Sequence, residues 1–482
     1  MAKKTFYITT PIYYANSGPH VGSAYTTIAA DILARWHRLQ EREVFFLTGT
    51  DEHGQKIQET AEKESLEPKK FVDKIVAEFK EVFKLLNISN NNFIRTTDKE
   101  HEKEVNKVLQ NLYNKKFIYK GKYEAYYCIG CEQYLTKRDL VDGKCQLHKK
   151  EPEIIKEESY MFKLSKFQDR LLTLIKNEEF CILPIKRRNE MISFIQNGLE
   201  DISISRKKSK VSWGIELPFD KNHTCYVWVD AFWNYLTGLG ANNFKKFWPP
   251  NVQLMANDIL RVHSTIWPAL LLALNHKLPQ ILFIHGYFTI NGQKMSKSLG
   301  NVISPAYLAN KYSTDSLRYY LIRKIPFGED GDFSEQALKE AHNNELANKL
   351  GNLISRVSTL AEKYQIQETI PIDNKLIIGK VSSFLEKYEL DKALNEIFAF
   401  VDTLNEYAQE KKPWDLGTPD REKVLYQLAN GVKDVAILLS PFIPSTSEKI
   451  AKTFNFKISL KQLNVPLKES KIKKSEILFK KI

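Results

Sequence analysis

Two short segments, far apart in the sequence, carry side chains that can handle phosphate groups. The first, His20-Val21-Gly22-Ser23, lies between an apolar run and the pattern of a helix. A glycine there lets a ligand approach the backbone, a helix N-terminus offers N–H donors to phosphate, and an imidazole can hydrogen-bond a phosphoryl oxygen. The segment therefore suits a nucleotide-binding turn without a Walker lysine, although His-x-Gly also occurs as an ordinary helix cap.

The second segment is a basic loop, Lys294-Met295-Ser296-Lys297-Ser298, which a glycine follows. Two lysines three positions apart could fold over a polyphosphate and neutralise the charge that develops on a leaving pyrophosphate. By composition alone, a solvated basic loop is the commoner explanation. The two segments together favour phosphate chemistry more than either does alone.

Four potential metal ligands, Cys128, Cys131, Cys145 and His148, have the spacing of a zinc knuckle. Two close ligand pairs separated by a loop can complete a tetrahedron. Because a closed tetrahedron leaves no position for water, we expect a structural site that holds its segment in shape over the active site. Reduced cysteines without a metal are the alternative. The other two cysteines are expected to be small core residues.

Alternating strands and helices must position these segments, and the hydrophobic pattern predicts them. The alternation is typical of a parallel α/β domain, here split by a lysine-rich insertion that holds the cysteines. The predicted strands are Thr5–Thr10, Glu43–Gly49, Gln253–Ala256 and Gln280–His285, the helices are Ala24–Arg38 and Arg261–Asn275, and a hairpin turns at Asn291-Gly292.

After Ser334 the apolar residues recur every three or four positions, which predicts helices alone. The last predicted helix stops before Pro441 and Pro444. The predicted units are 1–115 and 222–333 for the two halves of the α/β domain, 116–221 for the insertion, 334–455 for the helical domain and 456–482 for a C-terminal tail.

Composition limits the class of protein. The chain has 482 residues, of which 43% are hydrophobic, so wholesale disorder is excluded. The sequence contains neither a long apolar stretch for a membrane span nor a signal peptide, and its five cysteines are too few for a disulfide framework, so we expect a cytoplasmic protein. A net charge of +13 favours polyanionic partners without proving a nucleic acid.

The two phosphate-handling segments resemble the two signatures of class I aminoacyl-tRNA synthetases. The match of the basic loop is complete, whereas a second histidine is expected where Ser23 stands. From about Thr5 to Pro444 the chain resembles methionyl-tRNA synthetases in particular. The stretches that carry this resemblance are Ile12–Asn16, Gly49–Gly54, Val227–Ala231, Asn257-Asp258, His263–Ala269 and His285–Tyr287.

The resemblance implies a Rossmann-like parallel-sheet catalytic domain, split by the zinc-knuckle insertion and followed by an all-α anticodon-binding bundle. It implies a ligase that joins L-methionine to tRNA through methionyl-adenylate, using ATP with Mg²⁺ and a structural Zn²⁺. The implied catalytic residues are His20, Lys294 and Lys297, and the implied ATP-binding residues are Asn16, Gly22, Gly286, Met295, Ser296 and Ser298.

The resemblance also implies a methionine pocket in which Asp51 holds the ammonium group. Its other implied residues are Ile12, Tyr14, Trp228, Ala231, Tyr235, Ile284 and His285. Independently, a polarizable thioether makes favourable contacts with aromatic rings, which suits such a pocket. Aromatic residues seven apart, such as Trp228 and Tyr235, also occur in ordinary cores.

Three residues of the helical domain are implied to read the anticodon. Asn352 and Arg356 are four apart and share a helix face, and an exposed Trp414 would stack on an unpaired base. A hydrophobic plug after Pro413 is the alternative for this tryptophan. The expected partners are tRNA, ATP and L-methionine, with no membrane.

The C-terminal segment leads to an expectation about the oligomeric state. The roughly 35 residues after the bundle are too few for the dimerising module that some relatives carry, so a monomer is expected. The segment Ser475–Ile482 either docks onto the catalytic half or frays.

Other functions share parts of this pattern. A nucleotidyltransferase would share the α/β half but have no use for an RNA-reading domain, and a non-catalytic tRNA-binding paralogue would lose His20 or the two lysines. Another class I synthetase for a small apolar or sulfur amino acid is the nearest alternative; a cysteine-activating one would use zinc in its pocket. The insertion, about 100 residues long, is small for a separate hydrolytic domain.

Overall fold

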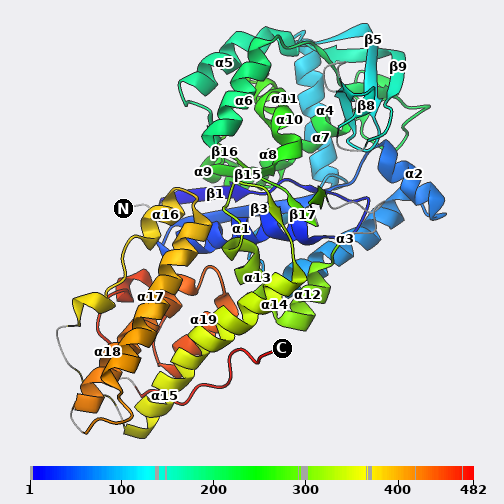
Figure 1. Ribbon diagram of the computed structural model, residues 1–482. Helices are drawn as coiled ribbons and strands as arrows, with labels where there is room; N and C mark the ends of the chain where they lie inside the picture. Colours follow the sequence, from blue (N-terminus) through cyan, green and yellow to red (C-terminus); the bar gives the residue numbers. More distant parts are fainter. Residues whose placement is uncertain are drawn as a thin grey trace.

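A seven-stranded parallel sheet forms the centre of the computed structural model, which describes residues 4–135, 140–146, 149–290, 292–294, 302–364, 366, 368, 372–417, 420–468 and 471–482 (Figure 1). The strand order is β10-β16-β15-β1-β3-β2, and β4 also pairs with β3. The strands are β1 (Thr5–Thr9), β2 (Tyr13–Tyr14), β3 (Glu43–Asp51), β4 (Asn92–Arg95), β10 (Cys181–Leu183), β15 (Val252–Ala256) and β16 (Ile281–His285).

Helices cover both faces of this sheet, so alternate residues of its strands enter two different cores. Phe6 and Ile8 of β1 pack into the core that contains α1, whereas Tyr7 packs with residues of α9. The helices of this part are α1 (Val21–Leu39), α2 (Gln55–Lys63), α3 (Pro68–Leu85), α4 (Lys99–Asn114), α7 (Val227–Ala231), α8 (Asn234–Thr237), α9 (Gly240–Phe247), α10 (Leu260–Ser264) and α11 (Ile266–Ala273).

The order of the strands decides where a ligand can bind. Strand β1 lies between β15 and β3, so successive crossovers leave it in opposite directions. Such a reversal opens a crevice at the carboxyl ends of the strands. Here these ends are Thr9, Asp51, Ala256 and His285.

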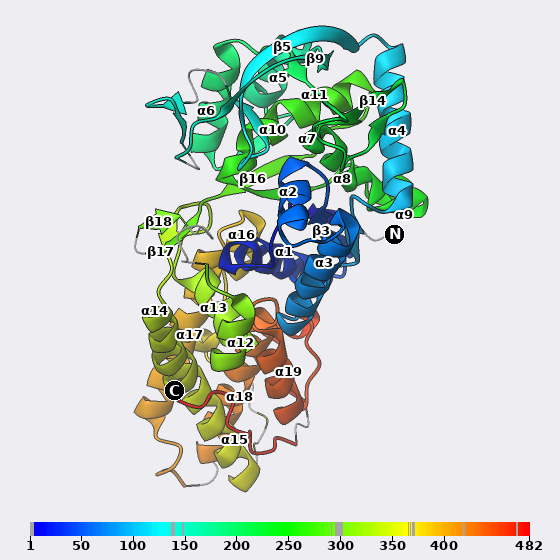
Figure 2. The ribbon, with the colours of Figure 1, turned by 90° about the vertical axis from the view of Figure 1, so that its right-hand side faces the viewer.

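The inserted segment forms a separate layer above the sheet (Figures 1 and 2). A four-stranded antiparallel sheet has the order β11-β9-β5-β6, and a three-stranded sheet has the order β12-β14-β13. The elements are β5 (Ile118–Cys128), β6 (Gln133–Leu135), β7 (Leu140–Val141), β8 (Lys144–Cys145), β9 (Glu153–Phe162), α5 (Gln168–Lys176), α6 (Ile185–Gln196), β11 (Ile202–Ser203), β12 (Ser205–Lys207), β13 (Glu216–Leu217) and β14 (Asp220–Cys225).

Helices form the tier below the sheet, as Figure 2 shows from the side. The elements are β17 (Phe288–Ile290), β18 (Gln293–Lys294), α12 (Pro305–Tyr312), α13 (Thr314–Arg323), β19 (Gly331–Asp332), α14 (Glu335–Glu340), the π-helical η5 (Ala341–Gly351), α15 (Asn352–Tyr364), α16 (Val381–Glu386), α17 (Leu390–Lys411), α18 (Asp420–Leu439) and α19 (Pro444–Thr453). In the described part of the chain, no helix combines the length and apolarity that a membrane crossing requires.

The C-terminal segment takes neither of the two expected courses. It packs on the helical tier, where Ser475 N donates to Ser358 Oγ at 3.0 Å and His342 Nε2 donates to the Lys480 carbonyl at 2.7 Å. The side chain of Phe479 is buried there. The helical domain therefore provides the apolar surface that this segment covers.

One predicted helix and one predicted domain boundary differ from the structure. The helix predicted over Arg261–Asn275 is divided at Thr265 into α10 and α11. Pro268 has no N–H, so the carbonyl of Ser264 cannot receive its helical hydrogen bond. The range 116–221, predicted as insertion, contains β10, which pairs with β16 of the main sheet.

Candidate active site

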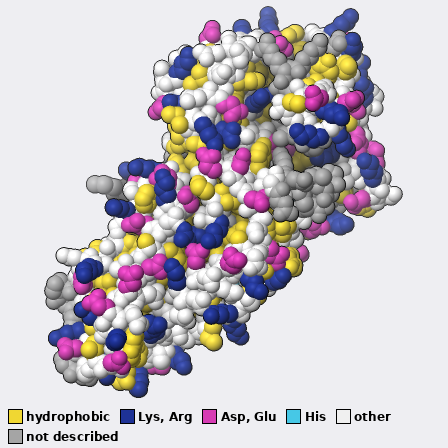
Figure 3. Space-filling model, viewed as in Figure 1, with side chains coloured by type: hydrophobic (Ala, Val, Ile, Leu, Met, Phe, Trp, Pro, Cys, Tyr) yellow, Lys and Arg dark blue, Asp and Glu magenta, His cyan; other side chains and the backbone are white. Residues whose placement is uncertain are grey.

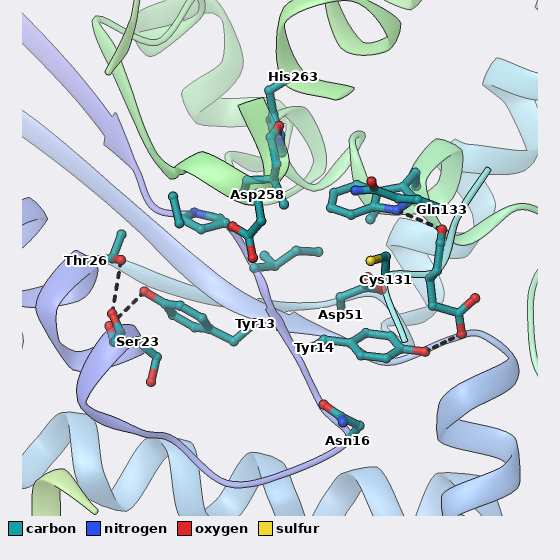
Figure 4. Close-up of a pocket in the computed structure, with 18 of the residues that line it drawn as sticks. Tyr13, Tyr14, Asn16, Ser23, Thr26, Asp51, Cys131, Gln133, Asp258 and His263 are labelled. Carbon is teal, nitrogen blue, oxygen red and sulfur yellow. Dashed lines mark hydrogen bonds between the residues drawn. The ribbon is translucent and has the colours of Figure 1, made fainter. Parts of the chain in front are cut away.

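A cleft of about 410 Å³ lies at the carboxyl ends of β1, β3, β15 and β16, within the usual range of about 300–1,000 Å³ for ligand pockets (Figure 4). Residues from six separate parts of the chain line it. The predicted metal ligand Cys131 is among them. The lining residues that were predicted for catalysis, ATP or methionine are Ile12, Tyr14, Asn16, His20, Gly22, Asp51, Trp228, Ala231, Tyr235, His285 and Gly286. The topology thus brings together most of the described residues that the sequence marked.

His20 is the N-cap of α1 and lines this cleft. Its Nδ1 accepts from Gly22 N at 3.0 Å, and its backbone N donates to Ser23 Oγ at 3.0 Å. Because Nδ1 accepts, a neutral ring carries its proton on Nε2, which makes Nε2 a donor. Ser23, where a second histidine was expected, completes this reciprocal cap.

The expectation of open N–H donors at the start of α1 is not met in this structure. The N–H groups of Gly22 and Ser23 both point to the His20 side chain, and Val21 N donates to the Ile303 carbonyl at 3.2 Å. The reason is that the imidazole satisfies the first turn of its own helix. A phosphate would have to replace these contacts.

Only the flanks of the basic loop are described, and the flank at Ile303 contacts the residue next to His20. On one side, Lys294 pairs with Thr289 in the β17–β18 hairpin. On the other side, Ile303 accepts from Val21, the residue next to His20. Met295, Ser296, Lys297 and Ser298 lie outside the described residues, as does Asn291 of the predicted turn.

Asp51 lies at the end of β3 with only 8% of its surface exposed. Its Oδ1 has no hydrogen-bond partner among the described residues. Burial raises the pKa of this carboxyl, and the charges of Asp230, Glu132 and Glu52 raise it further. Burial and the neighbouring carboxylates disfavour the ionised form of Asp51, and a bound cation would favour it again. The site is therefore suited to an ammonium group.

Aromatic side chains form the wall of the cleft beside Asp51. The Tyr235 hydroxyl donates to His263 Nε2 at 2.9 Å, and His263 Nδ1 donates to the Ile259 carbonyl at 3.0 Å. Burial lowers the pKa of His263 to about 4, which keeps the ring neutral and fixes Nε2 as an acceptor. Trp228, half-buried, meets the His263 ring edge-on. The wall is therefore aromatic and uncharged.

Strand β16 separates two residues that were predicted to share the pocket. His285 lines the cleft, with Nε2 2.7 Å from Thr26 Oγ1, whereas Ile284 is fully buried in the core on the side of the insertion. The cause is the alternation of side chains along a strand. Gly286 lies where an added Cβ would come within 2.3 Å of the Glu329 backbone, so this position requires glycine.

A buried charge network, which the sequence did not indicate, lies behind Asp51. Asp230 of α7 accepts from His53 Nδ1 at 2.7 Å and from His101 Nε2 at 2.9 Å. Burial alone would raise the pKa of Asp230, but the charge of His53 and hydrogen bonds from both histidines lower it. The network ties α7 and α4 to the end of β3. His263 and Glu132 were also missed as site residues, because no spacing rule connects them to the cleft.

The cysteine cluster lies within the insertion. The ligand atoms of Cys128, Cys131 and Cys145 lie within 4.8 Å of one another. Thiolates bound to one zinc at about 2.3 Å would be about 3.8 Å apart, so this donor set fits the ion. His148 lies outside the described residues. Cys225 is buried and Cys181 half-buried.

Two of the three predicted anticodon readers lie close together in the helical tier. The Arg356 guanidinium lies 5.4 Å from the centre of the half-exposed Trp414 ring. Asn352 is exposed one helical turn before Arg356 on α15. On the face shown in Figure 3, basic and acidic side chains are interspersed over this tier.

Comparisons with known proteins bear on the whole chain. Residues 6–145 and 135–358 match the family described as tRNA synthetases class I (M), and residues 373–482 match the anticodon-binding domain of tRNA ligase. The methionine--tRNA ligase of Caldanaerobacter subterraneus is 43% identical over 100% of this chain and 79% of its own length. That of Thermotoga maritima is 40% identical over 99% of this chain and 80% of its own length.

A solved structure shows the same fold. Mycobacterium tuberculosis methionyl-tRNA synthetase in complex with methionyl-adenylate has a TM-score of 0.94 and 32% identity, over 99% of each chain. Its free form has a TM-score of 0.85 and 30% identity, over 100% of this chain and 99% of its own. The chain therefore belongs to the class I aminoacyl-tRNA synthetases and, within them, to the methionine--tRNA ligase family.

Proposed function

We propose that this cleft performs the reaction of the family, in which L-methionine is ligated to its tRNA at the expense of ATP. The observation that carries the proposal is the convergence of His20, Asp51 and an aromatic wall in one cleft. Phe288 of β17, before the basic loop, also lines this cleft, and Ile303, after the loop, accepts from Val21 beside His20. The chain has an anticodon-binding domain for tRNA below this cleft. The roles of individual residues below belong to the same proposal.

Methionine binds with its ammonium group on Asp51 and its thioether against the aromatic wall. The buried Oδ1 of Asp51 accepts from the ammonium group. Trp228 and Tyr235 contact the thioether, with Ile12, Tyr14, Ala231 and His285 completing the cleft. Sulfur against aromatic rings contributes about 0.3–1.5 kcal/mol for each contact, without a strong donor.

In the first step, a methionine carboxylate oxygen attacks the α-phosphorus of ATP in line, the bond to the β-phosphate bridge breaks, and pyrophosphate leaves. His20 donates from Nε2 to an α-phosphoryl oxygen. Lys294 and Lys297 stabilise the departing pyrophosphate, and Asn16, Gly22, Gly286, Met295, Ser296 and Ser298 hold ATP. Mg²⁺ bound with ATP supplies further neutralisation of phosphate charge.

In the second step, a hydroxyl of the terminal ribose of tRNA attacks the carbonyl carbon of the adenylate, and AMP leaves. Asn352, Arg356 and Trp414 read the anticodon, the tryptophan by stacking on an unpaired base. These readers belong to the helical tier below the sheet, so a tRNA that reaches the cleft has to contact both parts of the molecule. We infer that the protein works in the cytoplasm, where thiols stay reduced.

A zinc ion in the insertion is part of the proposal. Cys128, Cys131 and Cys145 would hold it, with His148 as the fourth ligand. A closed tetrahedron supplies folding energy and no chemistry. Its removal is therefore expected to loosen the insertion without taking a group from the reacting atoms.

The experiment that tests the proposed roles is methionine-dependent exchange of pyrophosphate into ATP by the Lys297→Ala variant. The loss of a contact made only in the transition state is expected to lower the rate about 10²–10³-fold while methionine affinity changes little. Lys392→Ala, at an exposed position of α17 where the lysine pairs with Glu389, is the matched control and should keep the wild-type rate. An unchanged rate for Lys297→Ala would refute the role of the basic loop.

A further inference from the structure

Glu132 reaches from the cysteine knuckle into the cleft. It directly follows Cys131, lines the cleft, and is 5% exposed. Its backbone has a φ of 52°, in the left-handed region that non-glycine residues rarely adopt. Strain and a buried carboxylate at one position both oppose folding, so such a residue persists where its contacts over-determine it.

The carboxylate of Glu132 contacts two elements of the catalytic domain. Its Oε1 accepts from the Tyr14 hydroxyl at 2.9 Å and from Lys56 N at 2.8 Å. The Lys56 N–H belongs to the first turn of α2 and has no partner within that helix. Glu132 therefore caps α2 from a different domain and at the same time holds Tyr14. A dashed line marks the hydrogen bond of the Tyr14 hydroxyl in Figure 4.

The backbone carbonyl of Glu132 contacts the opposite wall of the cleft. It accepts from Trp228 Nε1 at 3.1 Å and from the Tyr226 hydroxyl at 2.5 Å. One residue thus holds Tyr14 with its side chain and Trp228 with its main chain. These are two of the residues that we propose to surround methionine.

The neighbouring backbone is shaped for this contact. Gly54, with a φ of 112°, lies where an added Cβ would come within 2.8 Å of the Tyr14 hydroxyl and 3.0 Å of Glu132 Oε1. Only a residue without a side chain leaves room for this arrangement. The Tyr127 hydroxyl donates to the second carboxylate oxygen, which fixes the rotamer of Glu132.

We propose that Glu132 is a positioning residue for methionine, which joins the metal-binding turn to Tyr14 and Trp228 and so lets the knuckle set the shape of the amino-acid pocket. The inference rests on the proposed function of the cleft. It predicts that the knuckle, although it takes no part in the chemistry, controls methionine affinity.

The test compares Glu132→Ala with Glu132→Gln in methionine-dependent pyrophosphate exchange. Loss of the charged acceptor for Tyr14 is expected to raise the methionine KM about 10–100-fold, while the ATP KM changes less than about twofold. Glutamine keeps an oxygen for Tyr14 and Lys56, so Glu132→Gln should stay within about threefold of wild type. Glu153→Ala, an exposed acidic position of the same insertion, is the matched control.

A second variant breaks the same contact from the other side. Tyr14→Phe keeps the ring and removes the hydroxyl, so it should raise the methionine KM even if Glu132→Ala folds poorly. In the double variant, the effects of Glu132→Ala and Tyr14→Phe should be less than multiplicative, because both remove one contact. Fully multiplicative effects, or an unchanged methionine KM in both single variants, would overturn the proposal.

Metal removal gives a readout that does not depend on activity. Equilibrium dialysis of radioactive methionine, before and after a chelator has removed the metal, measures affinity directly. Wild type should lose affinity on metal removal, whereas Glu132→Ala, already uncoupled, should lose much less; an equal loss in both would contradict the inference. If wild type itself shows no methionine-dependent exchange, the proposed function fails instead.

Discussion

Replacement of Asp51 by asparagine removes the charge that we assign to the methionine ammonium group while it keeps the shape of the side chain. Asp51 is 8% exposed, and its Oδ1 has no partner in the described part of the chain, so solvent can replace little of the lost interaction. The neighbouring carboxylates of Asp230, Glu132 and Glu52 remain in the variant. The change is therefore local to one charge.

The size of the effect follows from this geometry. A hydrogen bond to a charged group contributes about 1.5–3 kcal/mol, and about 1.4 kcal/mol is tenfold in affinity. Two opposite charges 4 Å apart attract by about 4 kcal/mol at an effective dielectric constant of 20, which is the upper limit for the binding energy that methionine could lose. The loss is smaller, because the other carboxylates still attract the ammonium group. We expect the methionine KM of Asp51→Asn to rise about 10–100-fold.

Pyrophosphate exchange measures this change, with a deaminated analogue as an internal control. 4-(Methylthio)butanoate has no ammonium group, so its inhibition constant should be nearly the same for wild type and Asp51→Asn. Because burial raises the pKa of Asp51, methionine binding to wild type should weaken as pH falls through a range above that of an ordinary carboxyl, and the variant should lack this dependence. An equal change for methionine and the analogue would refute the assignment.

Three further predictions concern other parts of the chain. Burial lowers the pKa of His263 to about 4, whereas a histidine in the unfolded chain titrates near pH 6.5. Between these two pH values the unfolded chain binds a proton that the folded protein does not, so the free energy of unfolding falls as the pH drops from 6.5 to 4. In thermal unfolding, His263→Gln should reduce the dependence of the free energy of unfolding on pH by up to about 1.4 kcal/mol per pH unit. An unchanged dependence would show that His263 does not titrate in this way. Trp414→Ala should raise the KM for tRNA about 5–100-fold through lost base stacking, with pyrophosphate exchange unaffected; reduced exchange would contradict a role confined to tRNA. Cys145→Ser should lose bound metal and lower the unfolding temperature of the insertion, and metal analysis that finds full occupancy would disprove the ligand role.

The central sheet was predictable because its strands are buried on both faces. Runs such as Glu43–Asp51 are apolar over most of their length, which is typical of a strand buried on both faces. The alternation of such strands with helices then predicts the α/β fold class. Strands β4 and β10 were missed, because four and three residues carry too little pattern to separate them from loops. Their pairing depends on contacts with β3 and β16, which sequence spacing does not reveal.

The site was predictable only in the parts that have a local signature. His20 follows a strand and begins a helix, and both features are visible in the sequence. Glu132 is different, because its role arises from contacts with Tyr14, 118 positions away, and with Trp228, 96 positions away. The pairing of Asp230 with His53 is of the same kind. Ile284 was assigned to the pocket by resemblance, and strand alternation places it in the core instead.

The central claim is that the cleft selects methionine, and exchange of pyrophosphate into ATP with each standard amino acid in turn tests it most directly. A methylene-scale difference in an apolar pocket is worth about 1–3 kcal/mol, so apolar competitors should react measurably but about 10–100-fold more slowly. Methionine is expected to support the fastest exchange at low concentration. Faster exchange with any other amino acid, or none with methionine, would contradict the account.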